Sequence, residues 1–186
     1  MANTRDQIVT LGRDFIQRVG YPSFSFRQIA SELGIKNAAV HYHFPLKEDL
    51  GVAVIEKDKS DFLEMGQALS KYSPVEKAEA VLNLYEHYFN EGQKLCLIGI
   101  CGSAYSELPV KMQEAAKEHL GNILAWLSET FRLGKESGDF SFQVAPREMA
   151  IQWVNTLPGT LISGRIFGRE YFLESLSALK KSLIMN

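Results

Sequence analysis

Apolar residues recur three and four positions apart along almost the whole chain. Ile8, Leu11 and Phe15 show this spacing in the first segment, and Gly20 follows where a helix could end. The spacing places apolar side chains on one face of an α-helix, whereas the alternation typical of a β-strand is not found in any segment. The pattern therefore predicts an all-α fold that begins with a helix over residues 4–19.

Two short helices are predicted directly after the first. Ser25 and Gln28 have the spacing of a capping box, in which each side chain satisfies a backbone N–H group of the other residue. This second helix is expected to end at Gly34. Asn37, a residue type that often caps helices, should begin a third helix over residues 38–44. Because so few residues separate the two helices, they must cross sharply.

The third helix has an apolar inner face and a small, polar outer face. Val40 and Phe44 lie four residues apart and should point inward. The outward positions are Asn37, Ala38, His41 and Tyr42. Such a face can enter the major groove of DNA and offer side chains to the base edges. An ordinary helical hairpin has the same spacing, so the spacing alone leaves both interpretations open.

The rest of the chain also has helical periodicity. Ser73, Pro74 and Glu76 form a clear helix start, with an N-cap, a proline in the first turn and a capping acid. Further helices are predicted over residues 47–69, 74–91, 109–136, 146–167 and 169–184. The apolar stretch 95–102 fits either a buried helix or a buried loop. Pro158 is expected to kink or break its helix.

Overall charge does not indicate a nucleic-acid ligand. The chain of 186 residues has a formal net charge of -2, and residues 1–50 carry only six Lys and Arg against five acidic residues. Its apolar stretches are shorter than a membrane span, and its first ten residues are polar, unlike a secretory signal. Two cysteines are too few for a disulfide framework. We therefore expect a cytoplasmic protein.

The region after Gly20 carries a specific pattern of residues. It runs Gly20-Tyr21, Ser25, Arg27, Ile29-Ala30, Leu33-Gly34-Ile35, Asn37-Ala38-Ala39-Val40-His41-Tyr42-His43-Phe44 and Lys47-Glu48-Asp49-Leu50. Without gaps, this pattern resembles the N-terminal signature of the TetR family of bacterial transcriptional regulators. The resemblance implies a helix-turn-helix DNA-binding domain over residues 1–50. It also implies a larger helical ligand-binding and dimerisation domain over residues 51–186.

The resemblance also implies which residues touch DNA. They are Ser25, Lys36, Asn37, His41, Tyr42, His43 and Lys47, with Arg27 close by and Ala38 as the small residue early in the third helix. Lys36 and Lys47 suit phosphates, whereas Asn37 and His41 suit base edges. His41 departs from the family, where Tyr is commonest, so an imidazole must replace a phenol. Gly12 replaces a usual Ala, and Phe24 replaces a hydroxyl residue and should pack into the core.

Two groups in the larger domain are candidates for its functions. Small and apolar residues that suit close helix approach across a homodimer interface are Thr156, Leu157, Thr160, Leu161, Ser163, Gly164 and Phe167. Candidates for an apolar ligand pocket are Tyr85, Tyr88, Phe89, Tyr105, Met112, Trp126 and Trp153. The alternative for both groups is packing in the interior of one subunit.

Together these features predict a regulator, most simply a repressor, that binds a palindromic double-stranded operator as a homodimer. A small apolar or aromatic effector would release it. The His and Cys residues lack metal-ligand or catalytic spacing, so we expect no enzyme, metal site, cofactor or membrane partner. One alternative is a redox-sensing regulator that uses Cys96 and Cys101. The other is an adaptor that keeps the helix-turn-helix only as a scaffold.

Overall fold

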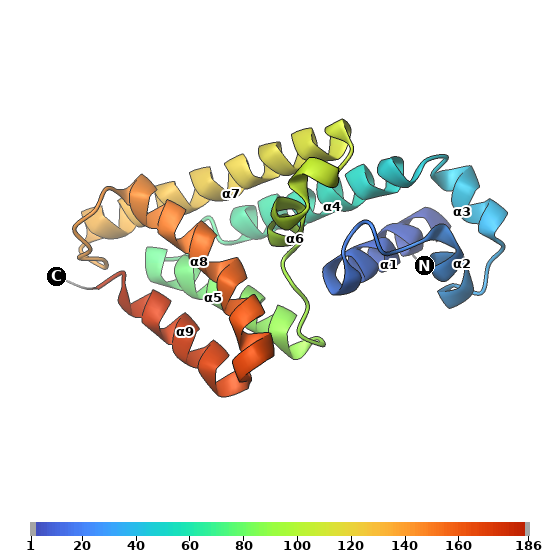
Figure 1. Cartoon of the computed structure of the whole chain (residues 1–186). Helices are drawn as coiled ribbons and strands as arrows, with labels where there is room; N and C mark the ends of the chain where they lie inside the picture. Colours follow the sequence, from blue (N-terminus) through green and yellow to red (C-terminus); the bar gives the residue numbers. More distant parts are fainter. Residues whose placement is uncertain (1–2, 185–186) are drawn as a thin grey trace. The chain divides into compact units, whose positions relative to one another are not determined.

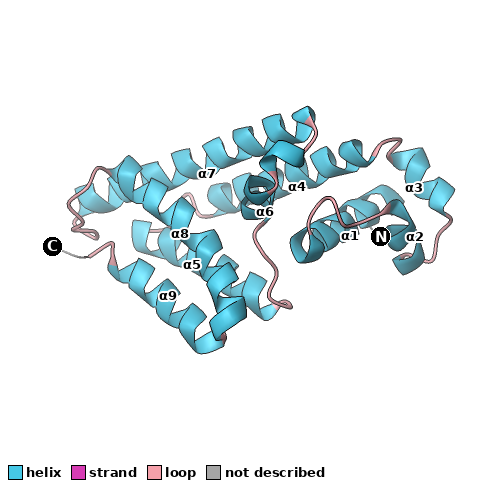
Figure 2. Cartoon of the chain, viewed as in Figure 1, coloured by secondary structure: helices cyan, strands magenta, loops and turns pink. Residues whose placement is uncertain are grey.

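The computed structural model describes residues 3–184, and all regular elements within them are helical (Figures 1 and 2). The elements are α1 (Thr4–Val19), α2 (Phe26–Glu32), α3 (Asn37–His43), α4 (Lys47–Ala68), α5 (Pro74–Asn90), α6 (Leu97–Ser103), the 3-10 turn η1 (Tyr105–Glu107), α7 (Val110–Ser137), α8 (Pro146–Phe167) and α9 (Arg169–Lys181). This confirms the all-α prediction for the described part of the chain. None of these helices is long and apolar enough to span a membrane.

The chain divides into two compact units. The first unit comprises Met1–Asp61 and Leu97–His119, and the second comprises Phe62–Cys96 and Leu120–Asn186. Helices α4 and α7 are therefore each divided between the two units, with one part in the first unit and the other part in the second. The division of the chain at residue 50 stays a prediction.

The first unit has its own apolar interior, in which α1 packs against α2, α3 and α6. Ile8, Ile29 and Val40 are fully buried there. Gly12, which departs from the family pattern, lies under Leu50. A Cβ at Gly12 would stand 3.3 Å from the Leu50 side chain. The glycine therefore allows Leu50 of α4 to pack closely against the backbone of α1.

The second unit is built around aromatic side chains, with α8 packed against both α5 and α9. Trp153 of α8 is fully buried, and its ring meets the ring of Phe131 edge-on at 5.1 Å between centroids. Phe89 of α5 and Phe172 of α9 stack face to face at 4.3 Å. Since such contacts also bury a large apolar area, they account for much of the stability of this unit.

Most predicted helix boundaries agree with the structure, and the predicted N-cap of α3 was wrong. Asn37 is the first residue of α3, while Lys36 is the N-cap residue with an extended backbone and no capping hydrogen bond. Helix α8 continues through Pro158, so the predicted break is absent and a kink at this residue stays a prediction. Leu157 and Leu161 are buried on either side of that proline, and their packing offsets the lost backbone hydrogen bond.

Two ambiguous or approximate boundaries are now defined. The apolar stretch around residues 95–102 contains α6, so the helical alternative is the correct one. Helix α9 ends at Lys181, earlier than the predicted residue 184, and hydrogen-bonded turns follow it.

Candidate nucleic-acid interface

Helix α2 starts with the predicted capping box. The Ser25 N–H donates to Oε1 of Gln28 at 2.7 Å, and the Gln28 N–H donates to Oγ of Ser25 at 3.4 Å. Phe24 and Ile29 lie on either side of this cap and are both buried. The cap therefore fixes where α2 begins, and it leaves Ser25 and Arg27 exposed at the surface beside it.

Helix α3 presents the predicted polar face to solvent. Val40 is fully buried and Phe44, which follows the helix, is nearly so, which anchors α3 through its inner side. The exposed face of α3 consists of Asn37, Ala38, His41 and Tyr42. Tyr42 is 84% exposed, an unusual state for a tyrosine in a folded protein. This face is free to meet a large partner.

Aromatic contacts orient the rings on α3. The His41 ring packs edge-on against Phe26 of α2, with 4.9 Å between centroids. Tyr42 and His43 meet edge-on at 5.2 Å, and His43 is only partly exposed. His41 is therefore supported by Phe26 while it stays exposed to solvent. Sequence reasoning placed His41 on the outer face but did not anticipate this support.

Lys47, at the start of α4, lies in an aromatic cage. Its Nζ donates to the carbonyl oxygen of Pro22 at 3.1 Å, and it stands 4.8 Å and 4.5 Å from the ring centroids of Tyr21 and Phe24. Partial burial lowers the pKa of Lys47. The pKa of Tyr21 is raised by burial and, less strongly, by the charges of Glu48 and Asp49. The cage ties α4 to the turn before α2, a role that the sequence did not reveal.

The predicted burial of Phe24 is confirmed, and its ring also forms one wall of this cage. The remaining cations of the region are more accessible. Lys36 and Arg27 are exposed, and neither forms an ion pair within the described residues. Arg5 of α1 is also exposed, and its guanidinium lies 5.1 Å from the ring centroid of Phe44, just after α3. Sequence reasoning missed Arg5 because nothing in the local pattern connects it to α3.

The predicted pocket residues are divided between the two units. Tyr105 and Met112 belong to the first unit, where Met112 is fully buried and packs near Gly51. The others lie in the second unit, and they are Tyr85, Tyr88, Phe89, Trp126 and Trp153. Most of these have aromatic neighbours: Tyr85 meets Tyr88, Phe89 stacks on Phe172, and Trp126 meets Phe62. Within each unit, packing accounts for the buried members.

The predicted dimer residues separate into two groups. Leu157, Thr160, Leu161 and Gly164 are buried, so their side chains offer almost no surface to a second subunit. A Cβ at Gly164 would stand 2.8 Å from the ring of Phe89 and 2.9 Å from Cβ of Phe172. These residues pack inside the second unit, and their assignment to the dimer interface stays a prediction. Thr156 and Phe167 are exposed and Ser163 is partly exposed, so they stay candidates for the interface.

Sequence reasoning missed other exposed apolar residues on α8 and α9. Ile151, Ile162 and Ile166 lie on α8, and Tyr171 lies on α9, where its ring packs near that of Phe167. Ile166 is 74% exposed. Their spacing could have indicated a second apolar face, but α8 is apolar on several sides and periodicity did not separate the inner face from the outer one.

The first unit as described defines a helix-turn-helix DNA-binding protein: two short helices joined by a tight turn, the second with an exposed polar face. Residues 8–54 match the family model for bacterial regulatory proteins of the tetR family. A crystallised TetR transcriptional regulator from Legionella pneumophila is 32% identical, with a TM-score of 0.88, and the match covers 100% of this chain and 99% of that chain. This protein belongs to the TetR family of transcriptional regulators.

More distant solved structures have the same fold. A TetR family regulator from Agrobacterium tumefaciens is 24% identical with a TM-score of 0.90, and the match covers 97% of either chain. The transcriptional regulator FadR from Bacillus subtilis, solved with stearoyl-CoA, is 17% identical with a TM-score of 0.72, covering 96% of this chain and 97% of that one. No curated protein sequence matches this chain. TetR regulators are ligand-responsive, DNA-binding transcription factors rather than enzymes, and they typically dimerise.

Proposed function

We propose that this protein is a transcriptional repressor that binds a palindromic operator as a homodimer in the cytoplasm and leaves it when a small apolar or aromatic effector binds. The observation that carries the proposal is the exposed face of α3. Asn37 and His41 on this face have the hydrogen-bonding groups that read base edges, while Tyr42 extends far into solvent.

The proposed contacts have separate roles. Asn37 and His41 are assigned to base edges, and Ala38 leaves room for α3 to approach the groove. Lys36, Arg27, Ser25 and Lys47 are assigned to phosphates around it, together with Tyr42 and His43. Arg5 is a further candidate for a phosphate, because it is exposed close to the end of α3. Phosphate contacts set affinity, and base contacts set sequence preference.

The exposed apolar residues of α8 and α9 support the proposed homodimer. Ile162, Ile166 and Phe167 are large side chains in solvent, where a second copy of the chain could cover them. Thr156 and Ser163 are included as smaller residues of the same helix. A two-fold dimer presents two copies of α3, and two such helices fit a palindromic operator.

The effector proposal rests on the apolar character of the larger domain. Its aromatic side chains suit an apolar ligand with few polar groups, and the distant FadR structure from Bacillus subtilis holds stearoyl-CoA. An effector that couples to DNA with about 1–3 kcal/mol would change operator affinity five- to 150-fold. An effector that raises the melting temperature but leaves DNA affinity unchanged would contradict release.

The alternatives have less support. Cys96 and Cys101 are both buried, and a buried thiol reacts slowly with oxidants, so redox sensing is disfavoured. An adaptor without DNA binding would have no use for the exposed Lys36, Asn37 and Tyr42. We therefore retain neither alternative as the proposed function.

Selection of DNA by the purified protein tests the proposal. Fragments of the source genome would be mixed with protein at low salt, and the bound fragments would be sequenced after several rounds. We expect enrichment of a palindromic sequence whose half-sites lie one helical turn or a multiple of it apart. Failure to retard any genomic fragment at low salt would revive the adaptor hypothesis.

Replacement of Lys36 and of Lys47 separates phosphate binding from structural support. We expect Lys36→Ala to flatten the salt dependence of operator affinity by about one ion with little effect on folding. Lys47→Ala should flatten it by about one ion as well, weakening binding to all sequences alike. Because Lys47 also ties α4 to Pro22 and two rings, its loss should lower the free energy of unfolding by about 1 kcal/mol.

Titrations of a labelled operator duplex at several salt concentrations, together with urea unfolding, provide both measurements. An unchanged salt slope for Lys47→Ala would remove Lys47 from the phosphate contacts and leave it as a structural residue. An unchanged slope for Lys36→Ala would do the same for Lys36.

A further inference from the structure

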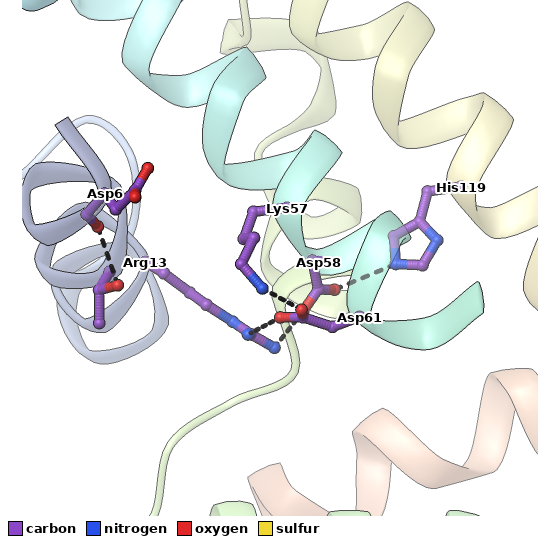
Figure 3. Close-up of polar contacts among 7 residues, drawn as sticks. Asp6, Arg13, Lys57, Asp58, Asp61 and His119 are labelled. Carbon is purple, nitrogen blue, oxygen red and sulfur yellow. Dashed lines mark hydrogen bonds and ion pairs between the residues drawn. The ribbon is translucent and has the colours of Figure 1, made fainter. Parts of the chain in front are cut away.

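A network of charged and polar side chains joins three helices within the first unit. Arg13 of α1 donates through Nη2 to Oδ1 of Asp58 and through Nη1 to Oδ2 of Asp61 at 3.1 Å. The second oxygen of Asp58, Oδ2, lies 3.1 Å from Nε2 of His119 on α7. Figure 3 shows Asp58 between Arg13 on one side and His119 on the other. One carboxylate of α4 therefore joins α1 to α7.

The side chains of this network become less exposed from Arg13 to His119. The side chain of Arg13 is 24% exposed, that of Asp58 is 12% exposed and that of His119 is only 1% exposed. A carboxylate can only accept hydrogen bonds, so Nε2 of His119 must carry the hydrogen. Because hydrogen bonds and charges act strongly when water is excluded, the loss of one partner disturbs the others.

The network differs from an exposed ion-pair cluster that lies on a single helix. Arg132 pairs with Glu129 and Glu136 on the same helix, and all three side chains are largely exposed. Such pairs contribute little and join nothing distant in sequence. Arg13, Asp58 and His119 come from three separate helices, and α1 in turn packs against α2 and α3.

We propose that His119 is a positioning residue for DNA binding: it orients Asp58, Asp58 holds Arg13, and Arg13 holds α1 in the place on which α2 and α3 pack. His119 does not touch DNA in this scheme. The inference rests on the proposed function for its effect on operator affinity. The structural part of the proposal, in which His119 stabilises the position of α1 through Asp58 and Arg13, does not depend on that function.

Two substitutions of His119 test the proposal. His119→Leu removes the N–H group that meets Asp58, whereas His119→Gln keeps a donor of similar reach. Exposed His87 of α5 offers the matched control His87→Leu. Hydrogen–deuterium exchange of full-length protein would follow the amides of α1, α4 and α7 in each variant. Affinity would be measured with the duplex recovered by selection, at protein concentrations corrected for the folded fraction.

We expect His119→Leu to raise amide exchange in α1 as well as in α4 and α7, and to weaken operator binding about two- to thirtyfold, the range typical of residues that act through others. His119→Gln should restore most of both properties, and His87→Leu should change neither. An increase in exchange confined to α4 and α7 would overturn the proposal. Faster exchange in α1 with unchanged operator affinity would also overturn it.

A reciprocal variant keeps the test decisive if His119→Leu does not fold. In Arg13→Lys a single ammonium replaces the planar guanidinium, which holds two carboxylates at once. If Arg13 and His119 act on each other through Asp58, this variant should show faster amide exchange around His119 in α7 and weaker operator binding. Unchanged exchange in α7 would overturn the linkage. If the wild-type protein selects no duplex, the proposed function fails, while the exchange experiment still decides whether His119 positions α1.

Discussion

Replacing Ile166 with aspartate is expected to separate the proposed homodimer into folded monomers and to weaken operator binding about a hundredfold. Ile166 is 74% exposed within its own subunit, so the substitution removes little internal packing. Burying an unpaired carboxylate in an apolar interface carries a large penalty. Monomers must then bind each half-site alone, and the loss of linked binding lowers affinity by two orders of magnitude or more.

Analytical ultracentrifugation and titration of a labelled operator duplex measure the two effects. Val110→Asp is a matched control, because Val110 is 67% exposed at the start of α7, where an acidic residue is well tolerated. The control should stay dimeric and bind normally. A dimeric Ile166→Asp variant with full affinity would show that this part of α8 is not the interface. A monomeric variant with full affinity would contradict binding to two half-sites.

Trp153→Ala is expected to lower the free energy of unfolding by about 3–5 kcal/mol, the range for replacing a buried large aromatic residue with alanine. Trp153 is fully buried and packs against Phe131, so alanine leaves a cavity among the aromatic rings of the second unit. For a chain of this size, the loss corresponds to a decrease of about 10 °C in melting temperature. Urea unfolding followed by circular dichroism measures it.

Two further variants show what part of the indole matters. Within the described residues, Nε1 of Trp153 is buried without a hydrogen-bond partner. Trp153→Phe, which removes this N–H and keeps an aromatic ring, should therefore cost much less than Trp153→Ala. Trp126→Ala is the control for tryptophan removal, because Trp126 is only partly buried. Equal losses from Trp153→Ala and Trp126→Ala would contradict the assignment of Trp153 to the core.

The helices and their starts could be predicted because they depend on neighbours in the sequence. The capping boxes at Ser25 and Ser73 each involve a residue three positions away, and both are present. The outer face of α3 followed from the same local periodicity. The N-cap of α3 was predicted one residue too late. Asn37 has a residue type preferred at N-caps, but Lys36 has the extended backbone of the N-cap position. Residue type alone locates a helix end only to within one or two residues.

The roles that residues take through contacts with distant parts of the sequence could not be predicted. Leu157 and Gly164 had the composition of a dimer interface, but α5 and α9 of the same subunit bury them. Lys47 had the chemistry of a phosphate contact, yet its ammonium is also held by Pro22 and two rings. Arg5 and Phe44 lie far apart in the sequence and meet only in the folded unit.

The sequence by itself determined the helical fold, the capped start of α2, the polar outer face of α3 and the resemblance to the TetR family. Only the tertiary structure decided which side of α8 is internal, what holds Lys47, and that Asp58 joins Arg13 to His119. The physical reason is the range of the interactions. Helix periodicity and caps depend on residues within about one turn of each other, so they can be recognised in the sequence. Burial and ion pairing bring together residues that lie far apart along the chain, and no local sequence pattern marks such pairs.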